Sequence, residues 1–206
     1  MRRFPVVVAA ATALITCLSA IVAAPALGAE KRTRYVHDDP AGDMEEVQPG
    51  AGGESGDFLR SVIRHRRHAI VIRSTFTDLV AEDFVTLHAD LSTDAHSLAD
   101  RGYAWRVVQI DWIEGLEPSA SLYDVDSIED IGCNNMSLNV DFDANTMRVR
   151  VPRPCLERPD WVRGDMFIAV HSGPGWESEW QDAAFSELIE GATSPRIFRE
   201  SPQPVA

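Results

Sequence analysis

Apolar and polar residues alternate on both sides of a polar segment, residues 143–146. The apolar positions before it are Met136, Leu138, Val140 and Phe142, and those after it are Met147, Val149 and Val151. Two runs with a period of two around a turn predict a β-hairpin with one apolar face. With residues 143–146 as the loop, Phe142 faces Met147, Val140 faces Val149 and Leu138 faces Val151, so every apolar residue meets another.

Runs of the same kind recur along the chain and predict further short strands. They cover residues 33–36, 58–64, 69–76, 84–91, 103–112, 119–125, 166–171 and 196–199. Residues 176–189 fit either a short helix or an irregular cover over a sheet. About nine short strands with hardly any helix are typical of an all-β chain, so we predict a single antiparallel β-sandwich domain.

The first 29 residues have a different character. Two arginines precede an apolar run over residues 6–24, and small residues follow up to Ala29, which is typical of a secretory signal peptide cleaved after Ala26 or Ala29. An uncleaved membrane anchor is the alternative, because the run approaches the length that spans a bilayer. We therefore expect an exported protein, secreted or at the cell surface, with no membrane span after cleavage, a sandwich over residues 30–200 and a tail over 201–206.

Charge and cysteine content bear on the partners and on the compartment. The chain has 19 basic and 32 acidic residues and a formal net charge of −13. Such acidity suits solubility outside the cell and makes nucleic acid an unfavourable partner. Cys17 leaves with the signal peptide, so Cys133 and Cys155 remain, and an oxidising compartment predicts a disulfide between them.

This disulfide conflicts with a hairpin that continues in strict register. Extended outward, the ladder would place Cys133 and Cys155 on opposite faces. Pro152 and Pro154 on one side and Gly132 on the other can interrupt the pairing. We therefore predict a regular hairpin only between about residues 136 and 151, with irregular, cross-linked flanks beyond it.

Two charged turns are candidate binding sites. Asp38, Asp39 and Asp43 offer the hard oxygen ligands that calcium prefers, although the spacing is not that of an EF-hand and such acids also occur as solvated turn residues. No other cofactor is indicated. At the predicted hairpin tip, Arg64, Arg66 and Arg67 with His65 and His68 form a basic patch that can dock a carboxylate or phosphate, or can simply be solvated.

Aromatic and catalytic candidates are fewer. Trp176 and Trp180 lie four residues apart beside glycines and acids, and can form a stacking platform for a ligand or fill the core. The chain contains no Gly-x-Ser-x-Gly and no His-Glu-x-x-His motif, so neither a serine-hydrolase elbow nor a zinc-hydrolase site is indicated. Paired carboxylates, as in glycosidases, cannot be located from sequence.

Three stretches together resemble a group of secreted β-rich proteins of high-GC Gram-positive bacteria that has no assigned activity. They are the turn Asp39-Pro40-Ala41-Gly42-Asp43, the segment 62–76 with Asp78-Leu79, and the segment 151–156 with Trp161-Val162-Arg163. A looser similarity to carbohydrate-binding β-sandwich modules rests on strand count and the acidic turn. We expect an exported, non-catalytic domain that binds an extracellular ligand or protein. The alternatives are a small extracellular hydrolase acting on glycans or cell-wall material, and a structural or assembly protein.

Overall fold

The computed structural model describes residues 31–50, 55–94, 106–173, 175, 177–185 and 194–201. The predicted signal peptide, Trp176 and the last residues of the predicted tail lie outside this part of the chain. Regular structure in the described part is β-strand, apart from one short 3₁₀ helix, η1 (Arg153–Leu156). No helix among these residues is long and apolar enough to cross a membrane.

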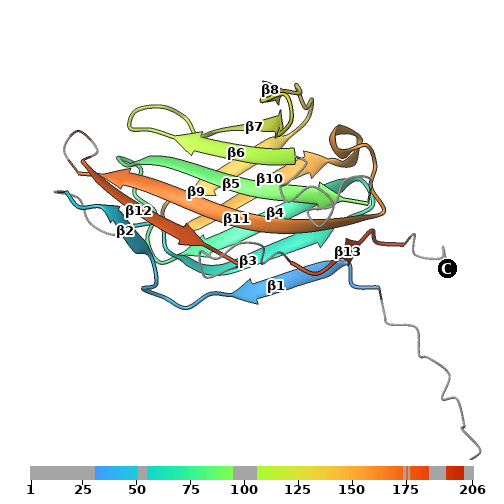
Figure 1. Ribbon diagram of the computed structural model, residues 1–206, viewed down its shortest axis with the longest axis horizontal. Coiled ribbons are helices and arrows are strands. Elements are labelled where there is room, and N and C mark those ends of the chain that lie inside the picture. Colours follow the sequence, from blue (N-terminus) through green and yellow to red (C-terminus); the bar gives the residue numbers. More distant parts are fainter. Residues whose placement is uncertain are drawn as a thin grey trace, which may run out of the picture. The chain divides into compact units, whose positions relative to one another are not determined.

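The strands form two antiparallel sheets (Figure 1). The five-stranded sheet has the order β1 (Arg34–Asp38), β3 (Phe58–His65), β4 (Ala69–Phe76), β10 (Thr146–Pro152) and β9 (Ser137–Asp141). The eight-stranded sheet has the order β2 (Glu45–Gln48), β12 (Ser178–Ala183), β11 (Trp161–Ser172), β5 (Phe84–Thr93), β6 (Arg106–Trp112), β7 (Ser119–Asp124) and β8 (Glu129–Asp130), with β13 (Ile197–Phe198) also paired to β11.

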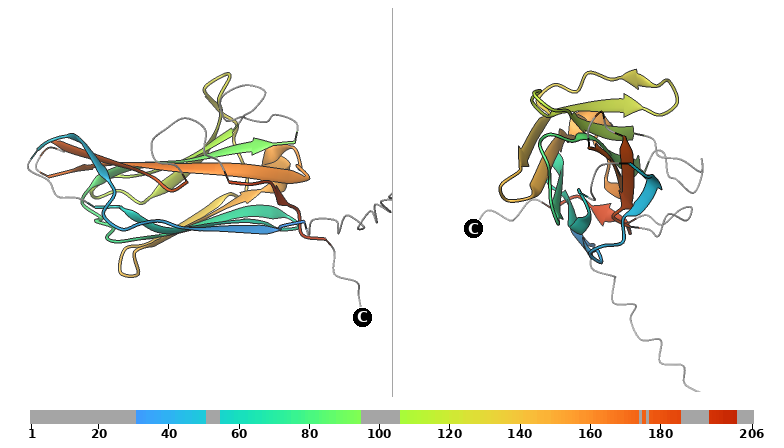
Figure 2. Two further views of the ribbon diagram at one scale, coloured as in Figure 1. Left: turned by 60° about the horizontal axis from the view of Figure 1, so that its bottom comes forward. Right: turned by 90° about the vertical axis from the view of Figure 1, so that its left-hand side faces the viewer.

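The two sheets lie face to face as layers around one apolar core (Figure 2). In β5 the alternation works as predicted, since Val85, Leu87, Ala89 and Leu91 are buried while the residues between them are partly exposed. The structure therefore confirms the predicted all-β sandwich. The described residues contain 13 strands rather than about nine. The predicted strands do not include β2 and β8, which are only four and two residues long and show no readable alternation, or β12.

The expectation of a helix or an irregular cover over residues 176–189 is wrong for residues 178–183. This segment is neither helical nor irregular but forms strand β12, which pairs with β11 on one side and β2 on the other. β12 satisfies backbone groups of β11 over Phe167–Ser172, on the edge of β11 opposite to β5. Tertiary pairing therefore overrides the weak local preference of the segment.

The central hairpin forms, but in a different register from the predicted one. Val140 pairs with Met147 and Leu138 with Val149, so the loop is residues 142–145. The shift by two residues keeps all the apolar side chains on the core face. Asn145 decides the shift: it has a φ of 50°, accepts a hydrogen bond from the Leu79 amide at 3.0 Å and donates one to the Thr77 carbonyl at 3.2 Å.

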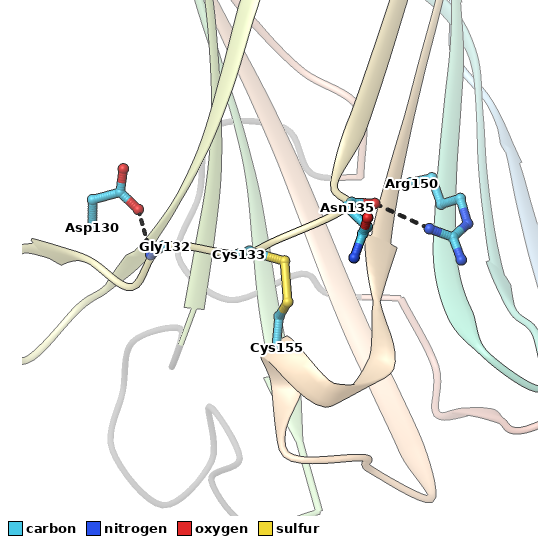
Figure 3. The surroundings of a disulfide bond; sticks show 6 residues. All are labelled: Asp130, Gly132, Cys133, Asn135, Arg150 and Cys155. Carbon is cyan, nitrogen blue, oxygen red and sulfur yellow. Dashed lines mark hydrogen bonds between the residues drawn. A yellow bond between two sulfur atoms is a disulfide. The ribbon is translucent and has the colours of Figure 1, made fainter.

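Cys133 and Cys155 form the predicted disulfide, with Cα atoms 5.6 Å apart. Neither cysteine belongs to the hairpin ladder, which ends at the Ser137–Arg150 pair. Cys133 lies in the loop before β9, and Cys155 lies in η1 (Figure 3). In that loop, the Gly132 amide donates to the Asp130 carboxylate at 2.8 Å. The predicted irregular, cross-linked flanks are therefore confirmed.

Candidate functional site

The outer face of the five-stranded sheet gathers arginines from four strands and one turn. Strands β1, β3, β4 and β10 turn alternate residues away from the core, and many of these positions are basic. A hollow of about 440 Å³ lies on this face, and six of its nine lining residues are arginines. We call these six the arginine face: Arg34, Arg60, Arg64, Arg66, Arg73 and Arg148.

Like charges lie directly opposite each other on this face. Arg34 pairs across strands with Arg64, and Arg73 pairs with Arg148. Directly opposed like charges destabilise a sheet. Among the described residues, Arg60 is the one member with a carboxylate within 4.0 Å, because its Nε lies 3.4 Å from Asp38 Oδ1. The arrangement therefore concentrates positive charge that the sheet itself does not neutralise.

Apolar residues of the same strands also line this hollow. They are Val62 and Val71, and Val71 is only 8% exposed. Long basic side chains commonly cover apolar surface with their stems and keep the charged head in water. The face can therefore present several guanidinium groups to one ligand, and none of its lining residues is aromatic.

The predicted basic patch at the hairpin tip belongs only in part to the arginine face. Arg64 and Arg66 belong to the arginine face, but His65 points inward, is fully buried and donates from Nδ1 to the Ile197 carbonyl at 3.1 Å. Desolvation by burial lowers the pKa of His65 to about 4, so it is neutral at physiological pH. Sequence reasoning missed Arg34, Arg60, Arg73 and Arg148, although each occupies an outward position of an alternating strand.

Of the three predicted calcium ligands, Asp38 lies apart from the other two. Asp38 is exposed and contacts Arg60, whereas Asp43 lies with Asp57 and Asp182 in a cluster with one carboxylate oxygen of each within 4.8 Å of the others. Asp39 adjoins this cluster: burial, and next the charge of Asp182, raise its pKa to about 7. Asp57 and Asp182 could not be predicted as members of this cluster, because they are remote in the chain from the acidic turn.

Of the two tryptophans of the predicted platform, Trp180 belongs to the described part of the chain. Trp180 lies in β12 opposite Val170, is partly buried and packs against the core. Its indole Nε1 is buried and has no hydrogen-bond partner among the described residues. Trp180 therefore contributes to packing, while Trp176 lies outside the described residues.

Two carboxyl groups face each other on the eight-stranded sheet. Asp90 in β5 pairs directly with Asp165 in β11. Burial raises the pKa of Asp90 to about 6, and burial followed by the charge of Asp90 raises that of Asp165 to about 6. A pair of facing carboxyl groups is the arrangement that the hydrolase alternative needs.

We expect the pair to make the protein less stable as the pH rises. An unfolded aspartate has a pKa of about 3.9, so between about pH 4 and pH 6 the folded state binds more protons than the unfolded state, and the free energy of unfolding falls as pH increases. Asp90→Asn should make the fall between pH 4 and pH 7 smaller, as measured by urea unfolding. Asp143→Asn, in an exposed loop position, should leave it unchanged; equal falls in all three proteins would contradict the prediction.

No protein-family model matches the chain, and no curated protein matches it. The class that the structure defines is an antiparallel β-sandwich with one disulfide-linked flank and a basic sheet face. A disulfide is compatible with an extracellular protein.

Proposed function

We propose that this protein is an exported, non-catalytic β-sandwich that binds an extended acidic glycan through the arginine face. The observation that carries the proposal is the opposition of Arg34 to Arg64 and of Arg73 to Arg148 across neighbouring strands. A surface that serves solubility alone intersperses both signs of charge. Here an acidic chain of net charge −13 collects positive charge on one sheet, which favours an anionic ligand.

The chemistry of the face favours carboxylate or sulfate groups repeated along a polymer. Guanidinium groups bind such anions through two parallel hydrogen bonds. Outward positions of one strand are about 6.6 Å apart and neighbouring strands about 4.8 Å apart, so the face is an array and not a single point of charge. Neutral sugars and single-stranded nucleic acid are bound largely by aromatic stacking, and the lining residues include no aromatic side chain.

Calorimetric titration with polygalacturonate and with heparin oligosaccharides tests the proposal. The wild-type protein should bind both, with an affinity that falls as salt increases, and should not bind neutral dextran. Arg73→Gln should weaken binding about tenfold, as expected for one lost charge-assisted hydrogen bond. The same change should leave the melting temperature unchanged or slightly higher, because it relieves the repulsion from Arg148.

Arg163→Gln is the matched control, because Arg163 belongs to β11 in the other sheet. Equal losses of affinity in the two variants would contradict a site on the arginine face. Stronger binding of single-stranded DNA than of the glycans would contradict the ligand class. Shortening of the glycan during incubation would contradict the non-catalytic part of the proposal.

A further inference from the structure

A second group of charges lies where the chain crosses from one sheet to the other. The crossing segment, residues 39–44, connects β1 of the five-stranded sheet to β2 of the eight-stranded sheet. It supplies Asp43, while Asp57 directly precedes β3 and Asp182 lies in β12. One oxygen of each of these three carboxylates lies within 4.8 Å of the other two. Acidic groups from both sheets therefore converge at one point.

Hydrogen bonds hold two of these carboxylates in place. Asp57 Oδ2 accepts hydrogen bonds from the Gly42 amide at 2.9 Å and from Thr77 Oγ1 at 2.6 Å. Asp182 Oδ2 accepts one from the Phe58 amide at 2.8 Å, which links β12 to the start of β3. The two side chains are 2% and 5% exposed, respectively. Their positions are thus set by the fold and not by solvent.

Two buried oxygens at this point have no hydrogen-bond partner among the described residues. They are Asp57 Oδ1 and Asp39 Oδ2. The Asp39 side chain is only 6% exposed, and its other oxygen lies 3.5 Å from His37 Nε2. Burying a carboxylate oxygen without a donor costs free energy that native proteins usually avoid. The orphaned oxygens are an observation separate from the proximity of the acids, and they point to a cation as the missing partner.

The charges around the cluster support this conclusion. Burial raises the pKa of Asp182 to about 6, and the charges of Asp43 and Asp57 act in the same direction. The pKa of Asp43 is also raised, first by burial and further by the charge of Asp57. His37 is the neighbouring basic group, and it contacts Asp39. The carboxyl groups repel one another in the absence of a positive charge between them.

We infer that Asp43, Asp57 and Asp182, with Asp39 beside them, form a calcium-binding site that fastens the crossing segment to both sheets. Calcium takes six to eight oxygen ligands in flexible geometry, and the cluster offers carboxylate oxygens from three separate segments. Magnesium demands near-ideal octahedral geometry and keeps several waters, so it fits such a cluster less well. This site is independent of the proposed glycan binding, because its residues are not those of the arginine face.

Thermal unfolding of the full chain, first treated with chelator and then supplied with calcium chloride, tests the inference. Calcium at a hundredfold excess over its Kd should raise the melting temperature by about 5–10 °C, and magnesium at the same concentration should raise it less. Asp43→Asn should weaken calcium affinity about tenfold or more, because it removes one charged ligand. Without calcium this variant should be as stable as the wild type or more stable, because repulsion is reduced.

Asp38→Asn is the matched control, since Asp38 is an exposed acid at the end of β1, directly before the crossing segment, and contacts Arg60. It should leave calcium affinity unchanged. A wild-type melting temperature that is the same with calcium and with chelator would overturn the inference. So would an equal loss of affinity in Asp38→Asn and Asp43→Asn. Asp43 is exposed, so its replacement does not threaten folding in the way that replacing Asp57 would.

Discussion

Replacing both Cys133 and Cys155 by alanine should lower the free energy of unfolding by about 3 kcal/mol. The bond links two cysteines with a sequence separation of 22. Its removal raises the conformational entropy of the unfolded chain and so stabilises the unfolded state. In a domain of this size the melting temperature should fall by about 6–12 °C. Differential scanning calorimetry and urea unfolding measure the change.

Reduction of the wild-type protein is the natural control for this variant. The reduced wild type and the double alanine variant should melt at nearly the same temperature, because both lose the same constraint. Alanine is preferred to serine because both cysteines pack against the core, where a hydroxyl would need a partner. Reactive thiols in the native protein, or an unchanged melting temperature after reduction, would contradict the prediction.

Truncating Ile63 to alanine should lower the free energy of unfolding by about 2–5 kcal/mol. Ile63 is fully buried in β3, and its Cδ1 occupies the space over Gly164 of β11. A Cβ added at Gly164 would lie 2.4 Å from that atom, which is too close for any real contact. The two sheets therefore meet at this point through an isoleucine on one side and a glycine on the other.

A double-mutant cycle tests this contact directly. Gly164→Ala alone should cost about 1–3 kcal/mol through overpacking. Ile63→Val removes Cδ1, so the glycine change should cost much less in that background. Ile72→Val is the control, because Ile72 is equally buried but is not among the atoms nearest to a Cβ at Gly164. Urea unfolding that shows additive effects in both cycles would contradict the contact.

The two candidate sites differ in the sign of their charge and in their exposure to water. The arginine face concentrates positive charge at the surface, whereas two of the three carboxylates of the cluster, Asp57 and Asp182, are buried. Salt should therefore weaken binding at the first much more than at the second, because buried charges are screened less. The sensitivity of each ligand to ionic strength consequently distinguishes the two sites.

Local pattern predicted much of the fold. A period of two identified the strands from residue 58 to residue 91 and both sides of the central hairpin, because alternation records directly which face of a strand is buried. The pair of cysteines predicted the disulfide, and its conflict with the ladder predicted where the ladder ends. The register itself was wrong by two residues, because a contact of Asn145 with the β4–β5 connection decides it.

By itself, the sequence determined the all-β class, the hairpin and its cross-linked flanks. Only the tertiary structure decided that Arg34 lies opposite Arg64 and Arg73 opposite Arg148, and that Asp43 meets Asp57 and Asp182. The physical reason is that burial imposes a pattern on each strand separately, so it can be read from neighbouring residues. Outward charges obey no such pattern, and which of them come together depends on how strands distant in the chain pair with one another.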